Sequence, residues 1–276
     1  MKTFITIFFA SILSLSMWCQ NGMKINNLAS GVGALICDSK VIGSGFLIEH
    51  DSVLFIVSAK HVFEHIPGES ISYETYPNGK SNGEVTSISV AFGQVKNTPF
   101  YHESETSDVA LLVVGYQKSA IEYQMLSFVE ASSTLPHINR SENLILLDDV
   151  WFSQEVVTVG FPSSLSINDP RLPFNRPLAV DGILSGFSQN NKIIARLAVF
   201  GGNSGGPVYS IISQRNNSDV TPYLGLVGLV VEYIPSLNAV FQNDNGQLPI
   251  TTNSGYALLE PSDEILRLLN EFSSFQ

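Results

Sequence analysis

The sequence predicts an all-β fold, and two features indicate it. From residue 31 onward, short apolar runs rich in Val, Ile and Phe alternate with turns rich in Gly, Asn, Ser and Pro. Within one run, Ile88, Val90 and Phe92 alternate with smaller residues, which is the period-2 pattern of a half-buried strand. Many short strands with almost no helical periodicity are typical of a β-barrel or a β-sandwich.

The apolar runs fall into two groups, separated by a less regular segment over residues 117–149. We interpret that segment as a crossing between two barrels. The expected strands of the first group cover residues 31–37, 41–49, 53–58, 86–95 and 109–114. Those of the second group cover residues 156–161, 178–187, 193–199, 207–212, 223–234 and 255–259.

One clear helical pattern stands near the C-terminus. Ser262 can cap its start, and Asp263 and Glu264 lie in the first turn, where acidic side chains are favourable. Its apolar face is expected to contain Ile265, Leu266, Leu268 and Leu269.

Composition limits the function classes. Of the 276 residues, 44% are hydrophobic and only 14% are charged, so the chain can bury a sizeable core and does not resemble a disordered protein. The formal net charge of −11 argues against a nucleic-acid partner, because a phosphate backbone would be repelled.

The N-terminus predicts an export signal over residues 1–19, with an approximate cleavage site. Lys2 precedes an almost unbroken apolar run over residues 4–18, which is too short for a comfortable membrane span. We therefore expect a secreted or periplasmic protein with no integral membrane span after signal removal. Lipid attachment at Cys19 is a second possibility, although bulky Trp18 fits it poorly. The alternative is a buried N-terminal strand or a membrane anchor.

Removal of the signal leaves Cys37 without a disulfide partner, in a run that indicates a small buried residue.

The sharpest chemical signal is Gly-Gly-Asn-Ser-Gly-Gly-Pro at residues 201–207. A serine hydroxyl attacks only when a base takes its proton and donors stabilise the oxyanion that forms. Flanking glycines would expose the hydroxyl of Ser204 and aim the N–H groups of Gly202 and Ser204 at one point. A glycine-rich hairpin turn is the alternative.

Two further motifs supply the partners that such a serine needs. His61 follows an apolar strand, and its imidazole suits a general base because its pKa lies near neutrality. Asp108 stands just before another apolar strand, where its carboxylate can meet an imidazole N–H. Taken singly, a surface histidine and a turn aspartate are the simpler interpretations.

Together, the three motifs resemble the chymotrypsin family of serine peptidases. They occur in the order His, Asp, Ser, at intervals of 47 and 96 residues (108 − 61 and 204 − 108). Ser-Ala-Lys-His at residues 58–61, Asp-Val-Ala-Leu-Leu at 108–112 and Gly-Asn-Ser-Gly-Gly-Pro at 202–207 are similar to the family's three motifs. Residues 157–162 and 255–257 resemble core strands of its bacterial, trypsin-like branch, the HtrA-type protease domain.

The resemblance implies two six-stranded antiparallel β-barrels and a C-terminal helix, with the active site in the cleft between the barrels. The first barrel, over residues 29–125, would carry His61 and Asp108. Residues 126–276 would hold the crossing segment, the second barrel with Ser204, and the helix. The implied activity is hydrolysis of a polypeptide substrate through an acyl-enzyme, with Gly202 and Ser204 as the oxyanion hole and with no cofactor or metal. The sequence does not specify the oligomeric state.

Two departures and the specificity residues qualify the resemblance. Asn203 stands where zymogen-activated members have an aspartate, so we do not expect that switch. We also expect no appended PDZ module after the terminal helix. Ala198 occupies the floor position of the specificity pocket, and we expect its walls to include Leu229, Val231 and Tyr233. An apolar pocket predicts cleavage after small or medium apolar residues, unless Glu232 turns inward.

Two other functions stay open. His61, Glu64 and His65 also spell H-x-x-E-H, a zinc-peptidase motif, but Pro67 and Gly68 would end the helix that it needs. The fold can also serve as a binding module that has lost catalysis. Filled positions for all three catalytic side chains argue against that loss.

Overall fold

The computed structural model of the chain describes residues 30–64, 66, 68–75, 85–120, 122–132, 135–168, 176–216, 219–243 and 246–274. The expected signal over residues 1–19, Cys19 and His65 lie outside these ranges and stay predictions. Within the ranges, none of the helices combines the length and the apolar character needed to cross a bilayer.

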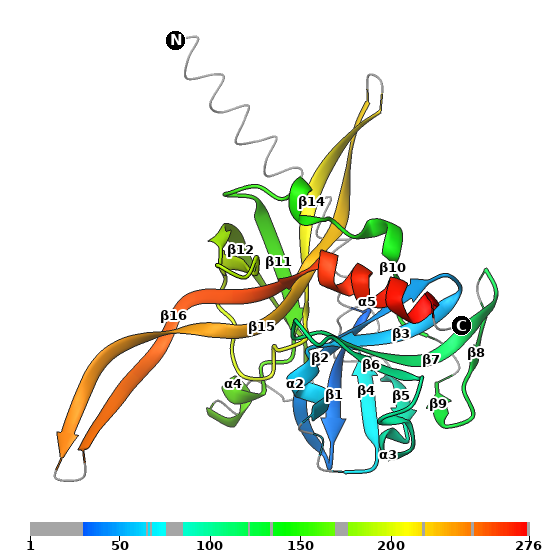
Figure 1. Cartoon of the computed structure of the whole chain (residues 1–276), viewed down its shortest axis with the longest axis horizontal. Helices are drawn as coiled ribbons and strands as arrows, with labels where there is room; N and C mark the ends of the chain where they lie inside the picture. The colour runs from blue at the N-terminus through cyan, green and yellow to red at the C-terminus, as the bar shows by residue number, and fades with distance from the viewer. Residues whose placement is uncertain are drawn as a thin grey trace.

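The first sheet contains ten strands in the described part of the chain and curls on itself (Figure 1). Its path runs β6-β7-β3-β2-β1-β4-β5-β9, with β10 beside β2 and β8 beside β7. The strands are β1 (Val32–Cys37), β2 (Lys40–His50), β3 (Val53–Ser58), β4 (Ile71–Thr75), β5 (Thr86–Val90), β6 (Tyr101–Glu103), β7 (Ala110–Ser119), β8 (Glu122–Met125), β9 (Val129–Ala131) and β10 (Asn139–Arg140).

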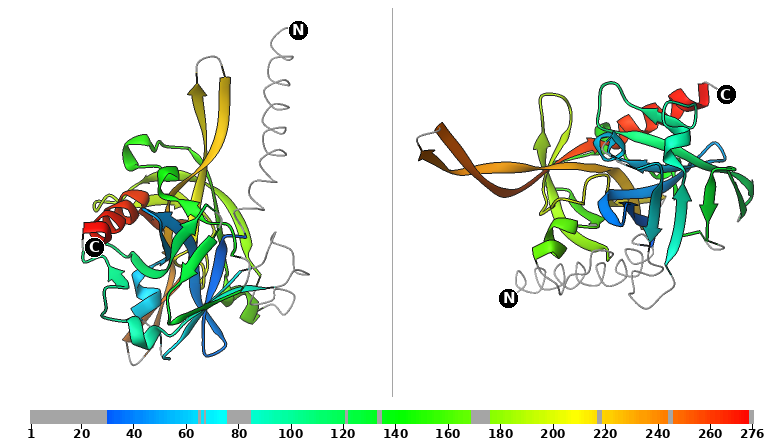
Figure 2. Two further views of the ribbon diagram at one scale, coloured as in Figure 1. Left: turned by 90° about the vertical axis from the view of Figure 1, so that its right-hand side faces the viewer. Right: turned by 90° about the horizontal axis from the view of Figure 1, so that it is seen from below.

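The second sheet is a closed barrel in the order β11-β12-β13-β16-β15-β14. Its strands are β11 (Glu155–Gly160), β12 (Leu178–Phe187), β13 (Ile193–Arg196), β14 (Pro207–Asn216), β15 (Asp219–Asn243) and β16 (Gly246–Pro261). The outer part of the β15–β16 hairpin projects away from the barrel, as the views in Figures 1 and 2 both show. The distal part of the β14–β15 hairpin projects as a separate arm (Figure 1).

Short helices connect these strands. They are α2 (Lys60–Glu64), α3 (Phe92–Val95), α4 (Ser163–Asn168), and the 3-10 turns η2 (Ser141–Asn143) and η3 (Leu147–Asp149). The expected strand over residues 86–95 is therefore wrong in its second half. Phe92 and Val95 are each 1% exposed and lie three residues apart, so helical spacing places both on the core side of α3.

The all-β class and its chymotrypsin-like arrangement are confirmed, with one difference in the first sheet. Strands β9 and β10, from the crossing segment, pair with β5 and β2 of the first sheet. The described part of the first sheet therefore contains ten strands, where the resemblance implies six. Cys37 is 3% exposed, as its apolar run predicts.

The C-terminal helix α5 (Ser262–Ser274) joins the two sheets. It continues directly from β16 of the second barrel, and the ring of Phe272 meets that of Phe55 in the first sheet edge to face, with centroids 5.2 Å apart. Its buried apolar positions are Ile265, Leu268, Leu269 and Phe272.

The expected capping role of Ser262 is wrong. Its hydroxyl is fully buried and donates to the carbonyl of Leu226 in β15 at 2.6 Å. The carboxylate of Asp263 accepts from the N–H of Leu147 at 2.9 Å. The first turn of α5 is thus tied to the second barrel by side chains, because both groups find partners there instead of at the helix's own N–H groups.

Candidate active site

His61 is placed by the central strand of the first sheet. All six residues of β3 are buried, and α2 begins two residues after that strand. Val62 and Phe63 anchor α2 in the core, and Phe63 stacks on Phe92 with ring centroids 5.6 Å apart. The His61 side chain therefore lies on the other side of the turn, where it is 39% exposed.

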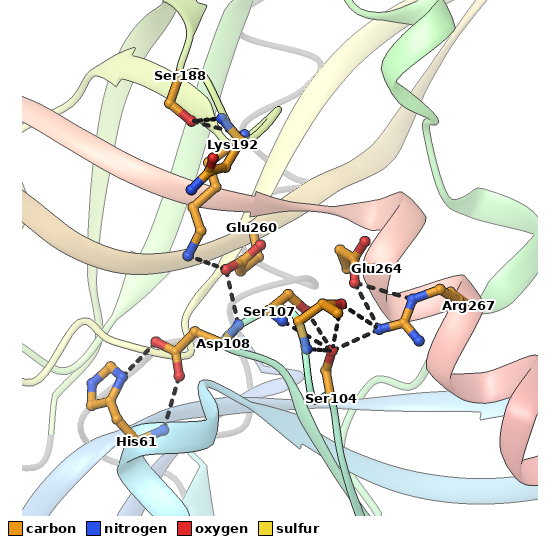
Figure 3. A network of polar contacts seen from close by, with 11 residues as sticks. His61, Ser104, Ser107, Asp108, Ser188, Lys192, Glu260, Glu264 and Arg267 are labelled. Atoms are coloured by element: carbon orange, nitrogen blue, oxygen red, sulfur yellow. Dashed lines mark hydrogen bonds and ion pairs between the residues drawn. The ribbon is translucent and has the colours of Figure 1, made fainter.

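Asp108 ends a loop that is held from two sides, and Figure 3 shows the side on which Arg267 contacts Ser104. The ammonium of Lys60 in α2 donates to the carbonyl of Ser104 at 3.0 Å, and its backbone N–H donates to the carbonyl of Asp108 at 3.2 Å. From the opposite side, the guanidinium of Arg267 in α5 donates to the Ser104 hydroxyl at 2.6 Å. These contacts fix the backbone that carries the Asp108 carboxylate.

His61 and Asp108 form a two-point contact. The imidazole Nδ1 lies 2.6 Å from Oδ2 of Asp108, and the backbone N–H of His61 donates to Oδ1 at 2.9 Å. An ionised carboxylate only accepts hydrogen bonds, so Nδ1 carries the proton in this contact. In the neutral ring, Nε2 is then the basic nitrogen.

The charges of the pair stabilise one another. The hydrogen bond to Asp108 raises the pKa of His61 above its ordinary 6.5, against the effect of burial, and the negative charges of Asp108, Glu232 and Glu64 add to the rise. Partial burial alone would raise the pKa of Asp108. The hydrogen bonds from His61, with the positive charges of His61 and Lys192, outweigh burial and lower it.

Ser204 lies in a tight turn that the first sheet clamps. The backbone N–H of Ser44 in β2 donates to the carbonyl of Ser204 at 2.8 Å, and the Ser44 hydroxyl donates to the carbonyl of Gly202 at 2.7 Å. The N–H of Asn203 donates to the carbonyl of Phe200 at 3.0 Å, and φ of Gly202 is +101°. A hydrogen-bonded four-residue turn with positive φ at its third residue is a type II turn, which requires glycine there.

The peptide between Gly201 and Gly202 has a fixed direction. The Gly201 carbonyl accepts from the N–H of Ser164 at 3.1 Å, at the start of α4. In a trans peptide the N–H points opposite to the carbonyl, so the N–H of Gly202 points away from α4. Among the described residues, no protein group accepts from the N–H of Gly202 or of Ser204. Both donors therefore remain available to a ligand.

Several contacts bring the serine turn beside the turn that carries His61. A Cβ on Gly205 would lie 2.1 Å from the Ser58 hydroxyl and 2.9 Å from the N–H nitrogen of Ala59, so only glycine permits this approach. The hydroxyl of Ser204 donates to the carbonyl of Val231 at 2.8 Å. Glu232, the next residue, is close enough to influence the charge of His61.

The expected specificity residues differ in exposure. Val231 and the 41%-exposed Tyr233 lie on β15 beside and just beyond Ser204. Leu229 is fully buried in the core, so its side chain supports the barrel and has no surface to offer a substrate. Ala198 is exposed and borders a pocket of about 290 Å³. The other residues lining that pocket are Glu155, Asp181, Gly182, Ile183, Arg196, Leu197 and Gly255.

Sequence reasoning missed three residues of the site, which are Ser44, Lys192 and Glu260. Ser44 is fully buried between two glycines of an apolar strand, and a polar residue at such a position is a signal that could have been followed. Glu260 accepts from the N–H of Asp108 at 2.9 Å and pairs with Lys192. A lone acid that closes an apolar strand marks Glu260 as unusual, but nothing local indicates its partners.

Asn203 is 1% exposed, and neither its side-chain oxygen nor its nitrogen has a partner among the described residues. A carboxylate in the same place would need a countercharge, because an isolated buried charge is far more costly than a buried amide.

The zinc alternative is not tested as a whole, because its second histidine, His65, lies outside the described residues. In the described part of the chain, no group of three His, Cys, Asp or Glu side chains is arranged to hold a metal ion. Nδ1 of His61 is engaged by Asp108, and α2 extends over only five residues.

We predict that the pKa of His61 lies above its ordinary value and falls in Asp108→Asn, because the largest contribution that raises it is removed while burial remains. Titration of the histidine side chains by NMR measures both values. His102 is the internal control, since burial lowers its pKa and Asp108 is not among the groups that shift it. A His61 that titrates below His102, or that does not respond to Asp108→Asn, would contradict the electrostatic account.

Comparison with solved structures supports this architecture. The chain resembles a serine endoprotease from Yersinia pestis (TM-score 0.49, 16% identity, 91% of this chain and 65% of that one). It also resembles the HtrA-type protease AlgW solved with a tripeptide (TM-score 0.51, 14% identity, 90% and 62%) and human heparin binding protein (TM-score 0.52, 12% identity, 89% and 93%). At these identities the two likenesses with TM-scores of 0.51 and 0.52 show the fold alone. The chain spans less than two thirds of the two bacterial proteases.

No curated protein sequence matches the chain. A sequence model of the trypsin-like peptidase domain matches residues 43–214, which include His61, Asp108 and Ser204. This match covers more than half of the chain, and the chain therefore belongs to the trypsin-like peptidase family.

Proposed function

We propose that the chain is a serine endopeptidase in which Ser204 is the nucleophile, His61 the general base and Asp108 the residue that orients the base. The observation that carries this proposal is the contact of 2.6 Å between Nδ1 of His61 and Asp108. With its proton on Nδ1, the neutral ring has Nε2 as its basic nitrogen, and the turn that carries His61 lies beside the serine turn. Within the described ranges, no protein group accepts from the N–H groups of Gly202 and Ser204.

The reaction begins with a change of hydrogen-bond partner at Ser204. A hydroxyl has one proton, and in the resting structure that proton is directed at the Val231 carbonyl. Rotation of the side chain to another staggered position redirects it to Nε2 of His61. One neutral hydrogen bond replaces another, and each is worth about 1 kcal/mol, so the exchange changes the free energy little.

The chemical steps then follow from the geometry. His61 takes the proton of Ser204 as Oγ bonds to the peptide carbonyl carbon, and the negative oxygen that forms is bound by the N–H groups of Gly202 and Ser204. Asp108 stabilises the imidazolium, which passes its proton to the leaving amine as the C–N bond breaks. Water, deprotonated by His61, then attacks the acyl-enzyme and releases the acid and Ser204.

We predict that a fluorophosphonate reagent labels Ser204 of the wild-type chain and that Ser204→Ala abolishes both the label and the hydrolysis of an unstructured protein substrate. Loss of the nucleophile should lower turnover by several orders of magnitude, and His61→Ala should add little to it, because the two residues act as one unit. Mass spectrometry of the labelled peptide and a protein-cleavage assay measure the two effects. Ser185→Ala, which changes an exposed serine of β12, is the matched control and should keep both.

Other outcomes assign other functions. Near-native cleavage by Ser204→Ala, with sensitivity to a chelator, would replace this proposal with a metal-dependent peptidase. Peptide binding without label or turnover in the wild-type chain would indicate a binding module, a use that the fold permits.

We also propose that an extended substrate lies along β15. Strand β14 pairs with β15 only as far as Leu229, and the Ser204 turn continues that pairing through Gly205 and Gly206 at Val230. Beyond this point, β16 pairs with β15 on the opposite edge. Among the described residues, no further strand pairs with the β14 edge of β15 at Val231–Tyr233, where the Val231 carbonyl accepts from Ser204. A peptide can therefore form backbone hydrogen bonds along it with little demand on its sequence.

For the residue before the cleaved bond, we predict small or medium apolar side chains, because Ala198 brings no charge to the floor position that the family resemblance gives it. A peptide-library cleavage profile measures the preference, which should be shallow, at about 1–3 kcal/mol per methylene. A strong preference for Arg or Lys would overturn this prediction and implicate Glu232, whose negative charge already reaches His61. The Glu232→Gln variant would then lose that preference.

A further inference from the structure

An ion pair lies directly behind the His61–Asp108 contact, on the side away from the imidazole (Figure 3). Glu260, near the end of β16, is paired with the ammonium of Lys192, and their side chains are 2% and 22% exposed. Both residues belong to the second barrel, whereas His61 and Asp108 belong to the first sheet. The ion pair therefore connects the second barrel to the His61–Asp108 pair of the first sheet.

One oxygen of the Glu260 carboxylate has two partners. Oε1 accepts the backbone N–H of Asp108 at 2.9 Å, and the same oxygen contacts Nζ of Lys192. A buried carboxylate is stable only when it is paired and hydrogen-bonded, and here Lys192 and Asp108 supply the two partners. Without Lys192, a second buried negative charge would stand next to that of Asp108.

The position of Lys192 is fixed by the turn between β12 and β13. The N–H of Ser188 donates to the carbonyl of Lys192 at 2.8 Å, and the N–H of Lys192 donates back to the Ser188 hydroxyl at 3.1 Å. Phe187 and Ile193 are paired on the two flanking strands. The lysine thus reaches Glu260 from a closed hairpin end.

The charge of Lys192 also reaches the active site. Burial acts to raise the pKa of Asp108, and Lys192 is one of the groups that lower it, after the hydrogen bonds and charge of His61. The other charged groups around the dyad come from three elements and are mostly paired. Lys60 and Glu64 pair within α2, Arg267 pairs with Glu264 and Glu271 within α5, and Glu232 faces His61 from β15.

We propose that Glu260 and Lys192 are positioning residues of the proposed peptidase: Glu260 holds the backbone of Asp108, and Lys192 cancels the charge that Glu260 would otherwise place beside the His61–Asp108 dyad. This inference rests on the proposed function for its catalytic meaning. Its electrostatic content, a coupling between the ion pair and His61, holds whether or not the chain cleaves peptides.

The test removes the charge of Glu260 alone and together with that of Lys192, and measures the titration of His61 in each variant. Glu260→Gln keeps an oxygen that can accept from Asp108 but leaves Lys192 without its countercharge. The added positive charge disfavours the imidazolium, so His61 should titrate at a lower pH, by on the order of half a unit. Lys192→Met combined with Glu260→Gln removes both charges and should return the titration to the wild-type pH. Lys192→Arg keeps the charge and should also match the wild type.

Two readouts separate this inference from the proposed function. The first is NMR titration of His61 in the Ser204→Ala background, which needs no activity and in which the resonance of His102 reports correct folding. The second is the acidic limb of the kcat/KM–pH profile, which should move in step. Glu122→Gln, in the exposed Lys118–Glu122 pair, makes the same charge change elsewhere and should leave both unchanged.

A titration of His61 that is the same in Glu260→Gln and in the wild type would overturn the inference, as would a shift that persists unchanged in the double variant. Because the NMR readout is independent of turnover, a chain that shifts as expected but cleaves nothing would refute the proposed peptidase and leave the coupling intact. A further double variant, Lys192→Met with Glu260→Leu, removes the acceptor for Asp108 and should lower kcat about tenfold without changing KM. An unchanged kcat there would show that Glu260 does not position Asp108.

Discussion

The hydrogen-bonded position of Asp108, at the boundary between the two sheets, is the constraint on which the site depends. Its two carboxylate oxygens are taken by the side chain and the backbone of His61, and its own N–H is taken by Glu260 of the other barrel. Each contact fixes a different part of the residue. The aspartate cannot turn away from the imidazole without breaking bonds in both halves of the molecule, so the geometry of the base is set by the docking of the barrels.

The serine turn shows the same dependence on two halves. Its sequence makes a type II turn with φ of +101° at Gly202, yet its orientation is set by Ser44 of the first sheet, which bonds both Gly202 and Ser204. The helix α5 adds a third link, because its Phe272 packs on Phe55 and its Arg267 holds the loop before Asp108. Among the described residues, buried polar contacts thus connect the two sheets beside the candidate site.

The sequence allowed prediction of what depends on local patterns. The run Val53–Ser58 is a fully buried strand, as its apolar composition indicates. His61 contacts Asp108, and Gly205, next to Ser204, packs against Ser58 and Ala59, just before His61. Contacts between residues far apart in the sequence could not be predicted from local patterns. Glu260 lies 152 residues from Asp108, and Ser262 donates to Leu226 because tertiary packing overrides its local capping preference. Strands β9 and β10, of three and two residues, are too short to leave a periodic signal.

The central claim is that Asp108 fixes the imidazole of His61 with its proton on Nδ1 and its basic nitrogen toward Ser204. The ¹⁵N chemical shifts of a histidine-labelled sample, recorded at a pH where His61 is neutral, report that tautomer directly. The account predicts a protonated Nδ1 and an unprotonated Nε2 in the wild-type chain, and a change of tautomer in Asp108→Asn, because the amide can donate its own proton to Nδ1. A wild-type His61 that carries its proton on Nε2 would contradict the account.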